Sequence, residues 1–176
     1  MHSGSADGDK QTAMAEIELP FELKRIESGR DVVRARSLLE EYQRSLGIDL
    51  EFQDFSAELT RLPGAYAPPR GRLYVAMMAR QLAGCVALRP LSDDECELKR
   101  LYVRPGFRSR GIGRLLTRHV IGEARAIGYS RVVLDTLQNM TEAHALYTRL
   151  GFTDIAPFNS TPFEGTRWMG LDLKAA

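Results

Sequence analysis

The sequence predicts an α/β fold in which a mixed β-sheet of about seven strands is flanked on both faces by about four helices. Two observations lead to this prediction. Short apolar or alternating runs, typical of strands, are interspersed with longer stretches whose apolar residues recur at helical spacing. Three strand-like runs also stand together before a succession of helix, strand, helix and closing strands. A length of 176 residues, 44% of them hydrophobic and 27% charged, fits one soluble globular domain.

The first elements are a strand and two helices. Residues 21–27 alternate apolar and charged side chains and are predicted to form a strand. A helix follows, with Asp31 expected to cap its start and Gly47 to end it. Residues 52–62 have the pattern of a second, short helix, and residues 65–71, which contain two prolines, are expected to form a loop.

The middle and end of the chain supply the rest of the sheet. Residues 73–78 and 83–88 are predicted to form a hairpin, and residues 96–103 the next strand. Residues 113–127 carry one apolar stripe at helical spacing, and Gly128 ends that helix. The remaining expected elements are a strand, a helix and two closing strands, at 131–136, 140–150, 153–158 and 167–173.

A net charge of +1 conceals a strong asymmetry along the chain. Residues 99–131 contain nine Lys or Arg and one acid, Glu123, whereas residues 16–58 are rich in Asp and Glu. The basic stretch lacks interleaved aromatic side chains, which argues against nucleic acid as a partner. A basic half and an acidic half instead suit a polyanionic cofactor on one side and an amine on the other.

Several classes of protein are excluded by composition. The apolar run 73–79 covers only seven residues, so no membrane span is expected. Residues 1–15 are polar and unlike a secretory signal, and we expect a disordered extension, native or left by cloning, before a single domain at 16–176. Cys85 and Cys96 are expected to be buried thiols in a reducing cytoplasm, with a disulfide between neighbouring strands as the alternative. Three scattered histidines and these cysteines form no metal-ligand set.

The most informative motif joins the strand 96–103 to the following helix. It reads Arg108, Ser109, Arg110, Gly111, Ile112 and Gly113. Two glycines allow the backbone to approach a bulky anion, and the first amides of a helix have no intrahelical partner. The side chains of Arg108, Arg110 and Arg114 add positive charge, although arginines on a helix are often simply solvated. This order of strand, glycine turn and helix predicts a pyrophosphate-binding site.

The surrounding residues indicate which pyrophosphate ligand is bound. The dinucleotide fingerprint fails because residue 116 is Leu, and the Gly-Lys-Ser/Thr phosphate loop is absent. The motif instead resembles the acetyl-coenzyme A loop of the GNAT superfamily of N-acetyltransferases, Arg/Gln-x-x-Gly-x-Gly/Ala. The resemblance extends to the strand 97–103 and to residues 143–152, which are similar to the family's Ala-x-x-Leu-Tyr-x-x-x-Gly-Phe signature. Roughly residues 21–173 can be aligned with this fold.

This resemblance implies a centrally splayed sheet that holds acetyl-CoA, as co-substrate, between two parallel strands. The backbone of Leu101, Tyr102 and Val103 is then expected to bind the pantetheine arm and to polarise the acetyl carbonyl. Many relatives have an Asn at the position of Met140. Either Asn139 replaces that contact with the cofactor or the contact is lost.

The resemblance also implies two catalytic side chains. Tyr147 is expected to act as general acid toward the leaving thiolate, because a phenol and an aliphatic thiol have comparable pKa values; packing between helix and sheet is its alternative role. Glu97 is expected to be the base that takes the amine proton, with a salt bridge to Lys99 or Arg100 as the alternative. Asp135, Glu142 and ordered water are further candidates for proton removal, and His144 is a weaker catalytic candidate.

The acceptor pocket of this fold lies between the first two helices and the closing strands. The residues expected to bind the acceptor are Tyr42, Phe52, Gln53, Phe158 and Asn159. Phe55, Tyr66, Phe163 and Trp168 are aromatic residues of the same regions. They favour a small primary amine or an amino-acid derivative as acceptor, in a monomer or homodimer. The alternatives are acetylation of protein lysines or N-termini, or a non-catalytic sensor of acyl-CoA.

Overall fold

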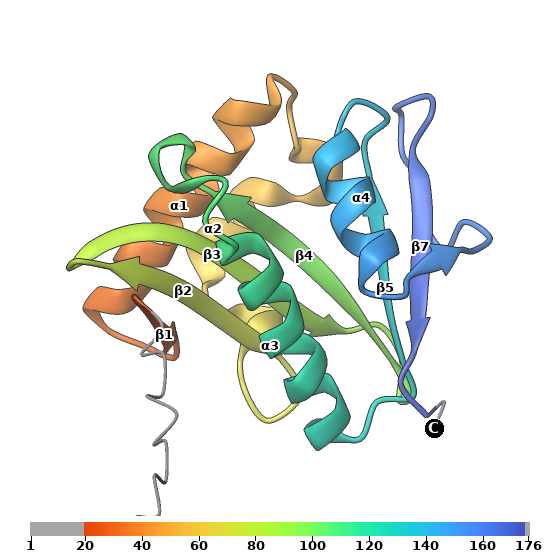
Figure 1. The fold of residues 1–176 in the computed structure, drawn as a ribbon, viewed down its shortest axis with the longest axis horizontal. Coiled ribbons are helices and arrows are strands. Elements are labelled where there is room, and N and C mark those ends of the chain that lie inside the picture. Colours follow the sequence, from red (N-terminus) through yellow and green to blue (C-terminus); the bar gives the residue numbers. More distant parts are fainter. Residues whose placement is uncertain (1–19, 175–176) are drawn as a thin grey trace, which may run out of the picture.

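A computed structural model of the protein describes residues 20–174; the expected extension at 1–15 lies outside them. A seven-stranded mixed sheet, in the order β1-β2-β3-β4-β5-β7-β6, forms the centre of the described chain, with helices on both faces (Figure 1). The strands are β1 (Phe21–Arg25), β2 (Arg72–Met78), β3 (Gln81–Pro90), β4 (Glu95–Val103), β5 (Arg131–Thr136), β6 (Thr153–Asp154) and β7 (Arg167–Asp172). The α-helices are α1 (Arg30–Leu46), α2 (Phe55–Arg61), α3 (Ile112–Ile127) and α4 (Thr141–Arg149), and the short 3-10 helices are η1 (Glu51–Gln53), η2 (Gly64–Tyr66) and η3 (Pro105–Phe107).

Two hydrophobic clusters, one on each face of the sheet, hold these layers together. On one face α1 and α2 bury side chains that include Leu38, Leu39 and Phe55. On the other face α3 buries its predicted stripe, and Tyr147 of α4 joins the same cluster. Because each face has its own cluster, the strands between them are buried on both sides, as a central strand of an α/β sheet must be.

The sheet opens between β4 and β5. These are the only neighbouring strands of the described chain that run parallel, and they pair over three positions, from Glu95 opposite Arg131 to Glu97 opposite Val133. Beyond this point β4 continues to Val103 and β5 to Thr136 without pairing, and the two strands diverge (Figure 1). The splayed sheet that the resemblance implied is therefore present.

A β-bulge in β4 changes which side chains face which cluster. Arg100 has a φ of 61°, and the register with β3 shifts between Cys85 and Ala87. Before the bulge Leu98 packs with the α3 cluster, whereas after it Tyr102 packs with the α1 cluster. The bulge thus interrupts the alternation that an undisturbed strand would have kept.

Three sequence predictions about local structure are wrong. The first helix begins after Gly29, so Asp31 lies in its first turn and does not cap it. The helix expected at 52–62 is broken by Asp54, whose φ of 54° separates η1 from α2. The strand expected at 153–158 ends after Asp154, because the chain then leaves the sheet as a loop.

The predictions for two helix ends and for the burial of the cysteines are confirmed. Gly47 and Gly128 end their helices in the left-handed conformation, with φ of 65° and 109°. Both cysteines are buried free thiols, and burial raises the pKa of each thiol to about 12. Between residues 20 and 174, no helix has the length and apolar character needed to cross a lipid bilayer.

Candidate active site

A groove of about 750 Å³ runs from the open end of β4 between the starts of α3 and α4. Nine of the eleven predicted cofactor residues line it: Leu101, Tyr102, Val103, Arg108, Ser109, Gly111, Ile112, Gly113 and Asn139. Met140, the departure from the family pattern, lies beside Asn139 in the same wall. The groove therefore collects strand backbone, glycine loop and helix start along one surface.

The glycine loop has the geometry of an anion site. Gly111 precedes α3 with a φ of 79°, a conformation that favours glycine, and no side chain caps the helix. The first amides of α3 are thus left for an external acceptor at the positive end of the helix dipole. The Nε of Arg108 donates to the carbonyl oxygen of Val103 at 3.0 Å, which ties the loop to the end of β4.

Two predicted cofactor residues do not line the groove. Arg110 extends toward β2, where its Nη1 lies 3.7 Å from the sulfur of Met78, and its guanidinium lies over the ring of Phe107. Arg114 is exposed on the first turn of α3. Both remain near the loop as positive charges without contributing to its walls.

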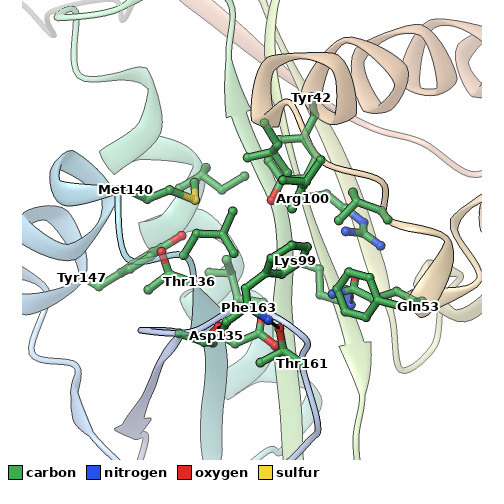
Figure 2. A pocket seen from close by; sticks show the side chains of 18 residues that line it. Tyr42, Gln53, Lys99, Arg100, Asp135, Thr136, Met140, Tyr147, Thr161 and Phe163 are labelled. Carbon is green, nitrogen blue, oxygen red and sulfur yellow. Dashed lines mark hydrogen bonds between the residues drawn. The ribbon is translucent and has the colours of Figure 1, made fainter.

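A smaller cavity of about 60 Å³ continues from the groove into the gap between β4 and β5. Tyr42, Leu46, Leu101 and Met140 line both spaces, so the two are contiguous. Figure 2 shows polar side chains from five helices and strands that line this cavity. They are Tyr42 of α1, Gln53 of η1, Lys99 and Arg100 of β4, Asp135 and Thr136 of β5, and Tyr147 of α4.

Tyr147 is 5% exposed, and its hydroxyl is directed toward the cavity (Figure 2). Burial raises the pKa of the phenol above its usual value, and the nearby Tyr42 and Asp135 raise it further. The phenol therefore stays protonated at neutral pH and can donate a hydrogen bond. Its ring lies 5.5 Å from that of Phe152, so the same residue also contributes to packing.

Glu97 is 1% exposed and is not one of the residues that line the cavity. Its Oε2 accepts from Nε of Arg89 at 2.8 Å, with Nη2 of Arg89 at the same distance. The Nζ of Lys99 lies 3.7 Å from its Oε1. The structure thus places Glu97 in an ion-pair network, with Lys99 between its carboxylate and the cavity.

The predicted acceptor residues divide into two groups. Tyr42, Phe52 and Gln53 line the cavity, whereas Phe158 and Asn159 do not. Asn159 instead donates from Nδ2 to Oδ2 of Asp135 at 2.7 Å and accepts from the indole of Trp168 at 2.8 Å. It therefore orients Asp135 from behind.

The same loop between β6 and β7 contributes Phe163 to the cavity. Its ring meets that of Phe52 edge to face at a centroid distance of 5.5 Å, which partly closes the mouth. Phe163 belonged to the aromatic set expected near the acceptor, and Thr161 and Thr166 beside it were not anticipated.

Lys99 and Arg100 are the cavity residues that the sequence interpretation missed as ligands. Adjacent residues of a regular strand face opposite ways, so their joint presence could not be expected without the bulge. Arg100 is committed to Glu58, with Nε to Oε2 at 2.9 Å and Nη2 to Oε1 at 3.1 Å. The available signal was the pair of adjacent basic residues inside the strand.

No group of three or more His, Cys, Asp or Glu is placed to hold a metal ion anywhere in residues 20–174. The chemistry of the described site is thus that of a phenol, a lysine, an aspartate and strand backbone beside an anion-binding helix start. The described residues thus combine the splayed sheet, the anion loop and the buried phenol that the resemblance implied.

Comparison with known proteins gives the family. The model of the acetyltransferase (GNAT) family matches residues 34–152, and the chain belongs to this family. A relative from Schizosaccharomyces pombe, named as an uncharacterized N-acetyltransferase, is 37% identical over 146 residues, which cover 82% of this chain and 90% of the relative. The protein is thus an acyltransferase of the N-acetyltransferase type.

Solved structures agree with this fold. An acetyltransferase from Streptococcus agalactiae superposes with a TM-score of 0.73 at 22% identity, covering 87% of this chain and 98% of the other. A GNAT acetyltransferase from Elizabethkingia anophelis, solved with acetyl-CoA bound, gives a TM-score of 0.63 at 21% identity, covering 87% and 98%.

Proposed function

We propose that the protein transfers the acetyl group of acetyl-CoA to a primary amine of a small molecule by direct attack in a ternary complex. The observation that carries this proposal is the continuity of groove and cavity. Both are lined by Leu101 and Tyr42, so a ligand in the groove and a ligand in the cavity would meet at the open edge of β4. A cavity of about 60 Å³ favours a small acceptor over a protein segment.

Acetyl-CoA is proposed for the groove because its parts match the walls. The diphosphate suits the uncapped start of α3 and the left-handed Gly111. The pantetheine arm suits the unpaired edge of β4 after Glu97, where backbone groups lack a strand partner. Such backbone donors also stabilise charge that develops on a carbonyl oxygen during acyl transfer.

The acceptor amine must lose a proton, and the leaving thiolate must gain one. We propose Tyr147 as the donor to the thiolate, because its phenol is protonated and lines the cavity. For the amine, Asp135 has direct access to the cavity, whereas Glu97 has access only past Lys99. We therefore propose that Asp135 binds the ammonium of the acceptor and takes its proton, and we retain Glu97 as the alternative base.

The proposal is tested by titrating acetyl-CoA into the wild type and two variants, Gly111→Asp and Gly111→Asn. Both side chains tolerate the left-handed conformation, and a Cβ at Gly111 would meet nothing within 4 Å, so the pair differs mainly in charge. We expect Gly111→Asp to bind at least about a hundredfold more weakly than wild type, or roughly 2.7 kcal/mol. Gly111→Asn should lose much less affinity for acetyl-CoA than Gly111→Asp. A wild type that does not bind acetyl-CoA would refute the proposed function, and binding without thiol release over an amine panel would indicate a sensor.

A further inference from the structure

Lys99 is a buried cation of the cavity that makes few hydrogen bonds. Its side chain is 7% exposed, and an ammonium has three N–H donors. Among the described residues it makes one hydrogen bond, to Oε1 of Gln53 at 3.2 Å, and one longer ion pair, with Glu97 at 3.7 Å. A buried ammonium with so few partners is costly unless a ligand completes its shell.

The surrounding charges leave Lys99 as the least committed cation of the cavity, with Glu97 at 3.7 Å as its one ion-pair partner. Arg100 is bound by both oxygens of Glu58, and Glu97 is already bound by Arg89. The titratable and charged groups that face Lys99 come from five elements: Arg89 of β3, Glu97 and Arg100 of β4, Asp135 of β5, Tyr42 of α1 and Tyr147 of α4. Burial and the neighbouring Arg100 together lower the pKa of the Lys99 ammonium to about 8, although Glu97 opposes the shift.

The opposite wall of the same cavity is acidic and polar. Asp135 lines it with a carboxylate that Asn159 holds through a single hydrogen bond. Next to it Thr136 is 5% exposed, lines the cavity, and has no hydrogen-bond partner for its hydroxyl within the described chain. Figure 2 shows Lys99 and Asp135 entering the cavity from the two separated strands. One small space therefore presents a cation, a carboxylate and an unsatisfied hydroxyl.

We propose that the acceptor is an amine that also carries a carboxylate, as a free amino acid does, and that Lys99 together with Gln53 binds this carboxylate. This inference rests on the proposed function. The ammonium of such an acceptor lies toward Asp135 and its carboxylate toward Lys99, so each buried charge of the cavity gains an opposite partner. An amine without a carboxylate would leave the Lys99 ammonium with only the longer Glu97 ion pair and would meet it as a like charge.

The test compares amino acids with their methyl esters and with the matching decarboxylated amines. Thiol release is measured for wild type, Lys99→Met, and Lys24→Met, a control at an exposed lysine of β1. In wild type we expect kcat/KM for at least one amino acid to exceed that for its ester and its decarboxylated amine by about tenfold or more, or about 1.4 kcal/mol. The ratio should collapse toward one in Lys99→Met, mainly through a rise in KM, and stay unchanged in Lys24→Met. Because the ratio is compared between variants, the different basicity of ester and acid amines cancels.

Two further readouts separate binding from folding and from the proposed function. Acetyl-CoA titration and thermal unfolding of Lys99→Met report whether the variant is folded, and Lys99→Arg, which restores a cation, should recover part of the ratio. As pH rises through about 8 and Lys99 loses its proton, KM for the amino acid should rise more in wild type than in Lys99→Met, which lacks the titrating ammonium.

Equal or better transfer to the decarboxylated amines, or an unchanged ratio in a folded Lys99→Met, would overturn this inference while leaving the acetyltransferase intact. Transfer to no amino acid by a protein that binds acetyl-CoA would overturn it as well. Failure to bind acetyl-CoA would refute the proposed function itself, and this inference with it.

Discussion

At the scale of single residues, the phenol of Tyr147 combines two roles, and a conservative substitution separates them. Tyr147→Phe keeps the ring that contacts Phe152 but removes the proton donor. We expect turnover to fall at least about tenfold, a bound set below the typical contribution of a general acid of about 10²–10⁴-fold, with unchanged affinity for acetyl-CoA. Tyr129→Phe is the control, because Tyr129 is buried away from the cavity and its hydroxyl bonds Arg70. Undiminished turnover in Tyr147→Phe would show that Tyr147 contributes packing and is not the proton donor.

A second pair of substitutions distinguishes the two candidate bases. Glu97→Gln removes a buried charge from between Arg89 and Lys99, so the free energy of unfolding should fall by about 1–3 kcal/mol. Asp135→Asn leaves that network intact and should instead lower turnover most near neutral pH, with partial recovery at high pH, where neutral amine is abundant. Denaturant unfolding and pH–rate profiles of both variants measure this. If Glu97→Gln shows the pH-dependent loss and Asp135→Asn does not, Glu97 is the base.

At the scale of elements, the pairing of β3 with β4 depends on a close approach at Gly84. A Cβ there would lie 2.5 Å from the carbonyl oxygen of Tyr102, and Gly84 stands opposite Val103, where β4 forms the groove. Gly84→Ala should therefore push the strands apart and lower the free energy of unfolding by about 1–3 kcal/mol. Weaker acetyl-CoA binding should accompany this loss.

The matched control is Gly122→Ala in α3, where an added Cβ meets nothing within 4 Å. It should raise the free energy of unfolding by up to about 1 kcal/mol, because alanine favours a helix over glycine. Denaturant unfolding of the two variants checks both signs. An unchanged free energy of unfolding in Gly84→Ala would mean that β3 and β4 can move apart without destabilising the protein.

At the scale of the whole molecule, the charge asymmetry of the sequence survives folding around the glycine loop and along α3. Arg100, Arg104 and Arg131 of the basic stretch are ion-paired with Glu58, Glu41 and Glu95. Five arginines of that stretch have no ion pair within residues 20–174: Arg108, Arg110, Arg114, Arg118 and Arg125.

The positive charge available to a ligand in the groove is thus smaller than the sequence implied, and Arg108, Arg110 and Arg114 supply it near the start of α3. Acetyl-CoA affinity should fall as salt is raised from about 0.1 M to 1 M, where the screening length shrinks from about 10 Å to 3 Å. Calorimetric titration at several salt concentrations measures the slope. An affinity independent of salt would assign binding to backbone contacts alone.

The sequence predicted the features that depend on local pattern and failed where long-range geometry decides. Helix ends at Gly47 and Gly128 follow from glycine's access to the left-handed conformation, and the anion loop follows from spacing. The break at Asp54 and the bulge at Arg100 place non-glycine residues at positive φ, which only their tertiary surroundings select. Without the bulge, the joint presence of Lys99 and Arg100 in the cavity could not be foreseen.

The bulge has a consequence for how this strand can change. When one extra residue is inserted into a strand, every later side chain points to the opposite face of the sheet. Here the shift falls between Lys99, which serves the cavity, and the stretch Leu101–Val103, which serves the groove. Point substitutions in β4 can change the lining of the cavity or of the groove separately. Deletion of Arg100 would make all later residues of β4 exchange faces at once. The shapes of the cavity and of the groove therefore depend on the same bulge.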